Sequence, residues 1–456
     1  MKKKAALRKA TPVKPTPLSE VSPNPITLSE WDILTPRSCP ELEGLFLDGG
    51  AATLKLAEEL SDSGMLHVTE LRSGLMIKTS SYVGRLRLGN LKVAINPKIE
   101  SNHLLGLLRY AFGFRNLRLA ARVEQTVAVS GFEDLLVSQL HAEVKELIAR
   151  GLRRAYLRSE EDLASPKGKI DIQKLADRIG VVSPKLPCCH YPRTEDIMLN
   201  RVLLAGLKLA ASIADDLELK RESNRLADLF VDRVSLIRLD ASVLNSLERQ
   251  MNRLTVAYDP AVSIIRLLCE SQGVLFQGIG PPIRLPGFLF DMNRFFQALV
   301  SRFLRENLAD WTVRDEYRLT GMMRYAPEFN PKHRTSPNPR PDFAVMSGEK
   351  VVEILDAKYR DLWEEKLPRE MLYQLAVYAI SRSEGKAIIL YPTEHPEAQE
   401  ARIDVHDPIS RREIARVWLR PVILPHLALL VMTHRSAKTV RDCAAYAKWL
   451  AFGCGA

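Results

Sequence analysis

Apolar and polar residues alternate in short runs in the first part of the chain, between about residues 65 and 98. The run at 83–88 places an apolar side chain at nearly every second position, which is the period of a half-buried β-strand. Gly89-Asn90 separates this run from the apolar residues 91–95, and such a pair is typical of a tight hairpin turn. Residues 104–112 then have a helical pattern. We therefore expect a small, hairpin-rich N-terminal domain.

A helical period replaces the alternation over about residues 130–255. The apolar residues of the first predicted helix recur on one face: Leu135, Leu136, Leu140, Val144, Leu147 and Ile148. A second amphipathic helix is expected over residues 196–214, and the turn-forming residues 165–168 interrupt the pattern between the two helices. Four arginines follow the first helix: Arg150, Arg153, Arg154 and Arg158. They are compatible with phosphate binding and equally with a solvated basic helix end.

The pattern changes again from about residue 288. An amphipathic helix carries Met292, Phe296, Leu299, Val300 and Phe303, and a strand-like run follows at 311–319. A loop rich in Pro, Asn and Arg at 327–341 leads to a strand-like run at 342–346 that starts with Asp342, a turn at 347–349 and a second strand-like run at 351–359. A helix over 364–382 and a buried strand at 387–391 complete the pattern. This order predicts a compact α/β unit with a mixed sheet.

These segments predict an α+β multidomain protein. The predicted parts are a disordered basic tail at 1–28 with order beginning near 26–31, a β-rich N-terminal domain at 29–125, a helical middle region at 126–285, an α/β domain at 286–425 and an unassigned C-terminal extension at 426–456. Five prolines and few large apolar residues account for the prediction of a tail.

Composition narrows the class of protein only a little. The formal net charge of +10 includes six Lys and Arg within residues 1–18, where there is no acidic residue, so the remainder carries 10 − 6 = +4. This mild excess permits nucleic-acid binding without requiring it. No apolar run is long enough for a membrane span, and the basic N-terminus lacks the apolar segment of a secretory signal, so we expect a cytoplasmic protein. The six cysteines have no zinc-site spacing and are expected to be reduced.

Candidate chemistry lies in the predicted hairpin of the α/β domain. Asp356 and Lys358 are two positions apart on one strand and therefore share a face, and a turn at 347–349 would bring Asp342 beside them. Two carboxylates can hold Mg²⁺, and a nearby cation can stabilise the charge that develops during phosphodiester hydrolysis. The structural alternative is an edge hairpin with a surface Asp–Lys pair of little energetic value.

The next predicted helix adds Gln374 and Tyr378, which are four residues apart and share one face. Gln374 could bind the DNA backbone or the attacking water, and Tyr378 could brace the lysine or a phosphate. An interfacial glutamine and a core tyrosine are the structural alternative. A QxxxY pair after a D-x-K strand is similar to the arrangement in RecB-like members of the PD-(D/E)XK superfamily.

Several motifs together resemble the McrC family, the cleavage subunits of 5-methylcytosine-specific McrBC restriction systems. The nuclease-domain resemblance covers residues 341–358 and Tyr373-Gln-Leu-Ala-Val-Tyr-Ala379. Upstream, the resemblance rests on segments 82–84, 97–99, 150–156, 167–171, 200–203 and 288–296, in colinear order over about residues 25–425. Residues 426–456 lie outside it.

The resemblance implies a C-terminal PD-(D/E)XK restriction-endonuclease-like domain in which Asp342 and Asp356 bind Mg²⁺ and Lys358 acts on water and phosphate. It also implies that the N-terminal and helical regions dock on a partner, an McrB-like hexameric AAA+ GTPase that reads methylated DNA. This chain contains no GxxxxGK[ST] phosphate loop, which agrees with nucleotide hydrolysis by the partner.

One departure from the family pattern is Gln297, where many relatives carry a glutamate that can join the metal shell. A neutral amide would bind Mg²⁺ more weakly, and Glu353 cannot replace it because an odd number of positions separates it from Asp356. Two other functions therefore stay open: a non-catalytic activator of the GTPase with a decayed nuclease site, and a stand-alone RecB-like repair nuclease.

Overall fold

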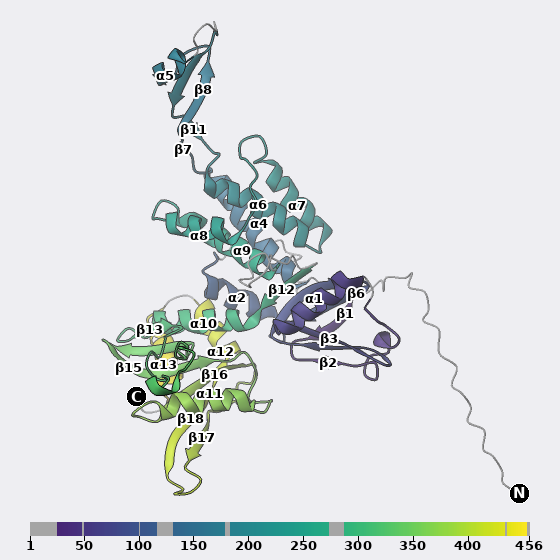
Figure 1. The fold of residues 1–456 in the computed structure, drawn as a ribbon, viewed down its shortest axis with the longest axis vertical. Helices are drawn as coiled ribbons and strands as arrows, with labels where there is room; N and C mark the ends of the chain where they lie inside the picture. Colours follow the sequence, from purple (N-terminus) through teal and green to yellow (C-terminus); the bar gives the residue numbers. More distant parts are fainter. Residues whose placement is uncertain are drawn as a thin grey trace, which may run out of the picture.

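The computed structural model describes residues 25–47, 50–99, 101–115, 131–177, 183–272, 287–433 and 436–453. Within these residues the chain is a mixed α/β protein. Figure 1 shows a sheet formed mainly by the N-terminal residues, a helical part from which a slender arm projects, and a C-terminal sheet with helices packed against it. None of the helices in the described ranges is both long and apolar enough to cross a membrane.

The N-terminal part consists of two small sheets with a helix. Its elements are β1 (Ile26–Ser29), β2 (Ile33–Leu34), η1 (Pro40–Leu42), α1 (Gly50–Asp62), β3 (Leu66–Leu71), β4 (Gly74–Thr79), β5 (Tyr82–Leu88) and β6 (Leu91–Asn96). The predicted turn is confirmed, because Leu88 pairs with Leu91 and Gly89 has the positive φ of 59° that favours glycine. β1 begins at Ile26, which agrees with the prediction that order begins near residues 26–31; residues 1–24 lie outside the described residues.

The larger N-terminal sheet has the order β1-β6-β5-β12, and its last strand comes from far along the chain. β12 (Gly287–Asp291) pairs antiparallel with β5, so residues 287–291 belong to this sheet and not to the C-terminal domain predicted to begin at residue 286. Gly84 and Gly287 allow the close approach, since an added Cβ at either would collide with the backbone opposite. The N-terminal sheet is therefore tied directly to the helix that follows β12.

The middle part is helical, as predicted, and has one feature that the pattern did not predict. Its helices are α4 (Phe132–Arg150), α6 (Met198–Ile213), α7 (Leu217–Asp228), α8 (Ala241–Gln250), η2 (Val256–Tyr258) and α9 (Asp259–Ser271). Between α4 and α6 the chain leaves the helical part as an arm (residues 155–194). The arm contains β7 (Ala155–Tyr156), β8 (Ser159–Leu163), β9 (Lys169–Ile170), α5 (Ile172–Ala176), β10 (Leu186–His190) and β11 (Arg193–Thr194). Figure 1 shows it standing away from the rest of the molecule.

The C-terminal part is built on a six-stranded mixed sheet with the order β13-β14-β15-β16-β18-β17. Its elements are α10 (Met292–Asn307), β13 (Thr312–Asp315), η3 (Pro327–Phe329), β14 (Phe343–Ser347), β15 (Lys350–Ala357), α11 (Arg369–Ile380), β16 (Lys386–Thr393), β17 (Ala401–His406) and β18 (Glu413–Ile423). β15, β16 and β18 are parallel, whereas β13, β14 and β17 pair antiparallel with their neighbours. The predicted helix, hairpin, helix and strand are all present, although strand β13 ends four residues before the predicted end at 319.

The C-terminal segment is part of this core. α12 (Leu424–Met432) packs on α2 (Ser101–Phe112), and α13 (Ala437–Phe452) packs on α10 and β15. Their buried apolar side chains join one continuous cluster with α2, α10 and the middle helices. Residues 426–433 and 436–453, which belong to the segment that the sequence left unassigned, therefore stabilise the face of the sheet opposite α11.

Candidate metal centre at the open end of a hairpin

Asp342 and Asp356 lie at the open end of the β14–β15 hairpin. Phe343 pairs with Leu355, so Asp342 and Asp356 are cross-strand neighbours one step further along. Such neighbours project to the same face of a sheet. The predicted convergence of the two carboxylates is confirmed.

The sequence of the hairpin explains this register. Ser347 pairs with Lys350, which leaves Gly348 and Glu349 as the two turn residues, and Gly348 has a φ of 61°. The side chains of residues 343–346 are all buried, so both faces of β14 are covered by the protein. A register shift between Val345 and Met346 then moves the pairing by one residue, so that Asp342 lies opposite Asp356 and not opposite Leu355.

Asp342 is held on both carboxylate oxygens. The backbone N–H of Ala357 donates to Oδ2 at 2.8 Å, and Nε2 of Gln297 on α10 donates to Oδ1 at 2.9 Å. Burial, and next the carboxylate of Asp356, raise the pKa of Asp342 to about 7. The two negative charges therefore oppose each other, and a cation between them would lower the pKa of Asp342.

Asp356 and Lys358 form a buried ion pair. Nζ of Lys358 lies 2.7 Å from Oδ2 of Asp356, whose side chain is only 1% exposed. The other oxygen, Oδ1, is buried and has no hydrogen-bond partner among the described residues. Burial lowers the pKa of Lys358, but the carboxylates of Asp356 and Asp342 more than offset this, and the pKa lies above its ordinary value. Lys358 is therefore a cation at neutral pH.

Tyr378 and Gln374 face this group from α11. The hydroxyl of Tyr378 accepts a hydrogen bond from Nε2 of Gln374 at 2.9 Å, and Gln374 itself is exposed. Burial raises the pKa of Tyr378, and the charges of Asp356 and Lys358 also act on its hydroxyl. The structure thus brings Tyr378 next to the two carboxylates and the lysine. Gln374 lies further out, at the protein surface, and contacts Tyr378. Their predicted roles with DNA or water stay predictions.

Glu353 takes no part in the group. Its carboxylate lies 2.6 Å from Nζ of Lys386 and 3.2 Å from Arg382. This agrees with the prediction that it cannot replace a glutamate at position 297. In the described residues, the only side chain from α10 that bonds to Asp342 is the amide of Gln297.

The donor set fits a hard divalent cation such as Mg²⁺. Carboxylate oxygens are its preferred ligands, and Oδ1 of Asp356 is a buried oxygen without a donor. Two carboxylates would leave the remaining coordination positions to water and phosphate oxygens. Charge and donor chemistry therefore both favour a cation between Asp342 and Asp356.

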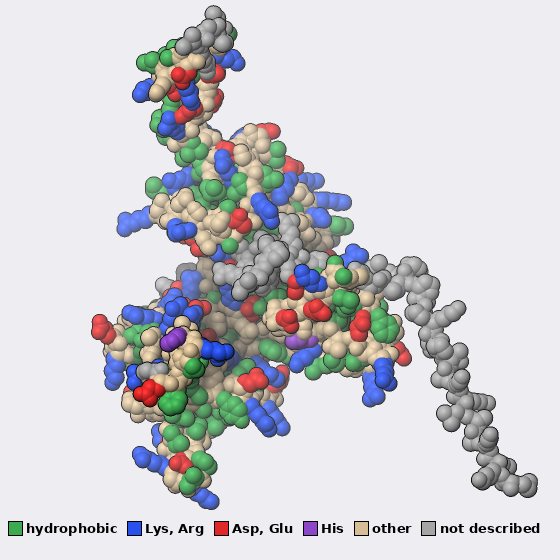
Figure 2. Space-filling view, viewed as in Figure 1, with side chains coloured by type: hydrophobic (Ala, Val, Ile, Leu, Met, Phe, Trp, Pro, Cys, Tyr) green, Lys and Arg blue, Asp and Glu red, His purple; other side chains and the backbone are tan. Residues whose placement is uncertain are grey.

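A cleft of about 550 Å³ leads to Asp342 along α10. Its charged lining includes Arg294, Arg302, Arg305, Glu306, Asp315 and Glu316. Because acidic and basic groups are both present, the cleft has no strong positive excess of its own. On the face drawn in Figure 2, Lys and Arg side chains are likewise spread over all parts of the molecule.

The comparisons with known proteins decide the family. A family model described as McrBC 5-methylcytosine restriction system component matches residues 77–392. The chain belongs to this family. No curated protein matches the sequence. This family match confirms the resemblance to the McrC family that the sequence motifs indicated.

One of two similar solved structures agrees with this assignment at the level of the fold. One chain from a Thermococcus gammatolerans assembly of McrB AAA+ hexamers with bound McrC has a TM-score of 0.58 and 17% identity, over 93% of this McrBC-family chain and 100% of the other. A chain of the T. gammatolerans McrBC complex, solved by cryo-electron microscopy, has a TM-score of 0.42 and 19% identity, over 64% and 90% of the two chains. The first likeness extends beyond the residues that the family model matches.

Proposed function

We propose that this chain is the Mg²⁺-dependent endonuclease subunit of a modification-dependent restriction system, with a nuclease domain of the PD-(D/E)XK class. The observation that carries the proposal is the meeting of Asp342, Asp356 and Lys358 on one face of the hairpin. A structural ion pair alone does not account for a second buried carboxylate beside the first or for the oxygen of Asp356 that lacks a donor. Membership of the McrBC family supports the same function.

The proposed chemistry assigns a role to each side chain. Asp342 and Asp356 would hold Mg²⁺, which supplies a polarised phosphate oxygen and an activated water when bound. Lys358, kept cationic by the two carboxylates, would stabilise the negative charge that grows on the phosphate during attack. Tyr378 would hold the lysine side of the site rigid through its packing against the sheet. Ala357 fixes Asp342 through its backbone N–H.

We also propose that the chain acts with an AAA+ GTPase hexamer that recognises methylated DNA. The support is the family and the similar fold found in the assembly of McrB hexamers with bound McrC. The arm provides a surface for such a partner, because it exposes the large apolar residues Tyr156, Leu157, Ile172, Leu175 and Tyr191. Figure 2 shows hydrophobic side chains along the arm, away from the core of the molecule. Exposed apolar groups of this kind are typical of interaction sites.

Asp356→Ala tests the proposal in a reaction that contains the partner GTPase, GTP and methylated DNA. Cleavage should fall to background, because an essential metal ligand is lost, while the stimulated GTP hydrolysis stays within the range of the wild type. Glu349→Ala is the matched control, since this exposed acid lies in the turn at the opposite end of the same hairpin. Cleavage unchanged by Asp356→Ala would contradict the proposal.

A second candidate function is an activator of the GTPase that does not cleave DNA. The observation in its favour is Gln297, whose amide donates to the carboxylate oxygen of Asp342 that a metal would use. Stimulated GTP hydrolysis without any metal-dependent cleavage by the wild type would support this candidate. The third possibility, a stand-alone repair nuclease, has no support from the family match. Cleavage of DNA by the chain alone, without a GTPase, would support it.

A further inference from the structure

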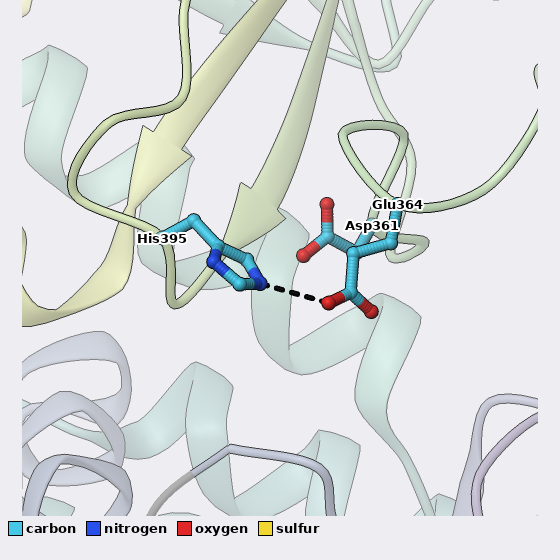
Figure 3. Close-up of side chains that lie close together, drawn as sticks. All are labelled: Asp361, Glu364 and His395. Atoms are coloured by element: carbon cyan, nitrogen blue, oxygen red, sulfur yellow. Dashed lines mark hydrogen bonds and ion pairs between the residues drawn. The ribbon is translucent and has the colours of Figure 1, made fainter.

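A second group of metal-ligating side chains lies outside the proposed magnesium centre. Asp361 and Glu364 lie in the segment between β15 and α11, and His395 follows β16. One ligand atom from each residue lies within 4.8 Å of the others. Figure 3 shows the imidazole and the two carboxylates facing one another.

Each of these side chains is oriented by its neighbours. Nε2 of His395 lies 2.8 Å from Oε1 of Glu364, while Nδ1 lies 3.1 Å from Oε1 of Glu397. A carboxylate on the far ring nitrogen commonly orients a histidine that binds a metal. Asp361 accepts hydrogen bonds from the hydroxyl of Thr393 and from the backbone N–H of Trp363. Asp361 and His395 are thus oriented before any ion binds, whereas Glu364 is held only by His395, and an ion would take the place of the proton between them.

An independent observation comes from Glu30 in the N-terminal part. Glu30 lines the same cleft of about 220 Å³ as the three side chains. It is 0% exposed, and its Oε1 accepts from the backbone N–H of Lys98 at 2.8 Å and from the hydroxyl of Tyr359 at 3.0 Å. Its Oε2 is buried and has no hydrogen-bond partner among the described residues. The charge of Lys98 acts on this carboxylate, but burial outweighs it and raises the pKa of Glu30 to about 8, so a further cation in the cleft would stabilise the ionised form.

We propose that Asp361, Glu364 and His395 bind a divalent transition-metal ion, with zinc as the ion best suited to them, in a structural site between the N-terminal and C-terminal sheets. One imidazole nitrogen and two carboxylate oxygens fit zinc, whereas Mg²⁺ prefers oxygen ligands alone. A fourth position would be open to water on the side of the cleft that Glu30 lines. The ion would tie two parts of the chain together: the segment just after Lys358, which carries Asp361 and Glu364, and the residues just after β16, which carry His395. This site does not depend on the proposed nuclease function.

Zinc binding by the full chain tests the site, and the Asp356→Asn variant is the suitable background because it removes a ligand of the magnesium centre. Calorimetric titration with ZnCl₂ in excess Mg²⁺, together with elemental analysis after dialysis, should give one zinc per chain. Glu364→Gln should weaken binding by about tenfold or more, and His395→Gln should abolish it. Glu364 has a side chain that is 61% exposed, so its amide variant is expected to fold normally.

Glu365→Gln is the matched control. It removes the same charge from the same cleft, but Glu365 is paired with Arg360 and is not one of the three ligands. This variant should bind zinc as the background does. Absence of zinc from the background protein, or zinc that survives both Glu364→Gln and His395→Gln, would overturn the proposal. In the first case the group is only a set of ion pairs around His395, and in the second the zinc is held elsewhere.

Discussion

The charges around Asp342 and Asp356 set the behaviour of the proposed magnesium centre. Lys358 offsets only part of their negative charge, since the pKa of Asp342 remains near 7 despite the lysine and two hydrogen-bond donors. Burial is the main cause of the raised pKa, because the carboxylate of Asp342 loses its solvation. The like charge of Asp356 is the second cause. A cation would therefore compete with a proton for this carboxylate.

This competition predicts how the metal requirement depends on pH. The pKa of Asp342 is raised, so the carboxyl is mostly protonated below pH 7 and mostly ionised above it. The Mg²⁺ concentration that gives half-maximal cleavage should fall by about fivefold between pH 6 and pH 7, by about another twofold up to pH 8, and then level off. Initial cleavage rates across a Mg²⁺ series at each pH measure this. A requirement that is flat or rises over this range would contradict the assignment of Asp342 as a ligand.

Gln297 gives a second prediction for a single side chain. The amide of Gln297 donates a hydrogen bond to Oδ1 of Asp342. A glutamate at position 297 would lose this hydrogen bond and would offer a carboxylate oxygen to the metal instead. Gln297→Glu should therefore lower the Mg²⁺ concentration for half-maximal cleavage, by about tenfold if the third carboxylate joins the metal shell. Gln250→Glu serves as the control, because this glutamine is exposed at the last position of α8, outside the proposed centre. A higher metal requirement in Gln297→Glu would show that the amide is needed as it stands.

Among the elements, the β14–β15 hairpin was the part best predicted from sequence. Its turn and strands are local properties, and residues 342–358 predicted that the two carboxylates meet. The register shift between Val345 and Met346, which brings Asp342 opposite Asp356, was not predicted. The same holds for the helices α4, α6 and α10, whose apolar faces repeat at helical spacing. β12 was assigned to the wrong unit because its pairing with β5 joins residues about 200 positions apart. The arm was missed because its strands are short and largely exposed.

The turn of this hairpin can be tested by its stability. Gly348 has a φ of 61°, and an added Cβ there would meet no atom within 4 Å, so the cost of a side chain is conformational. Gly348→Ala should lower the free energy of unfolding by about 1 kcal/mol. Chemical denaturation measures the change, with Ser347→Ala at the neighbouring exposed position as the control. Equal stability of the two variants would contradict the two-residue turn.

The arm allows a test of partner binding at the level of an element. Ile172 is 74% exposed at the first position of α5, where an aspartate is compatible with the helix. Ile172→Asp should weaken association with the GTPase and reduce its stimulation. Ile409→Asp is the matched control, because Ile409 is 92% exposed in the turn between β17 and β18. If both variants bind the partner equally well, this face of the arm is not the docking surface.

Across the whole molecule, the N-terminal sheet contacts the segment that carries Lys358. The hydroxyl of Tyr359, one residue further on, donates to Glu30, and the guanidinium of Arg360 lies over the ring of Trp31 at 5.5 Å. β12 joins the same sheet to α10, the helix that holds Gln297. The N-terminal sheet and the proposed magnesium centre are therefore connected by two short routes. Neither route could be predicted from sequence, because each depends on contacts between distant residues.

The central claim is that Asp342, Asp356 and Lys358 form a metal-dependent nuclease centre. Cleavage of methylated DNA across a Mg²⁺ titration, with the partner GTPase and GTP present, tests it most directly. The account predicts no product in excess EDTA, a saturable rise in rate with Mg²⁺ for the wild type, and no product at any Mg²⁺ concentration for Asp356→Asn. Product formed in EDTA, or at the wild-type rate by Asp356→Asn, would contradict it.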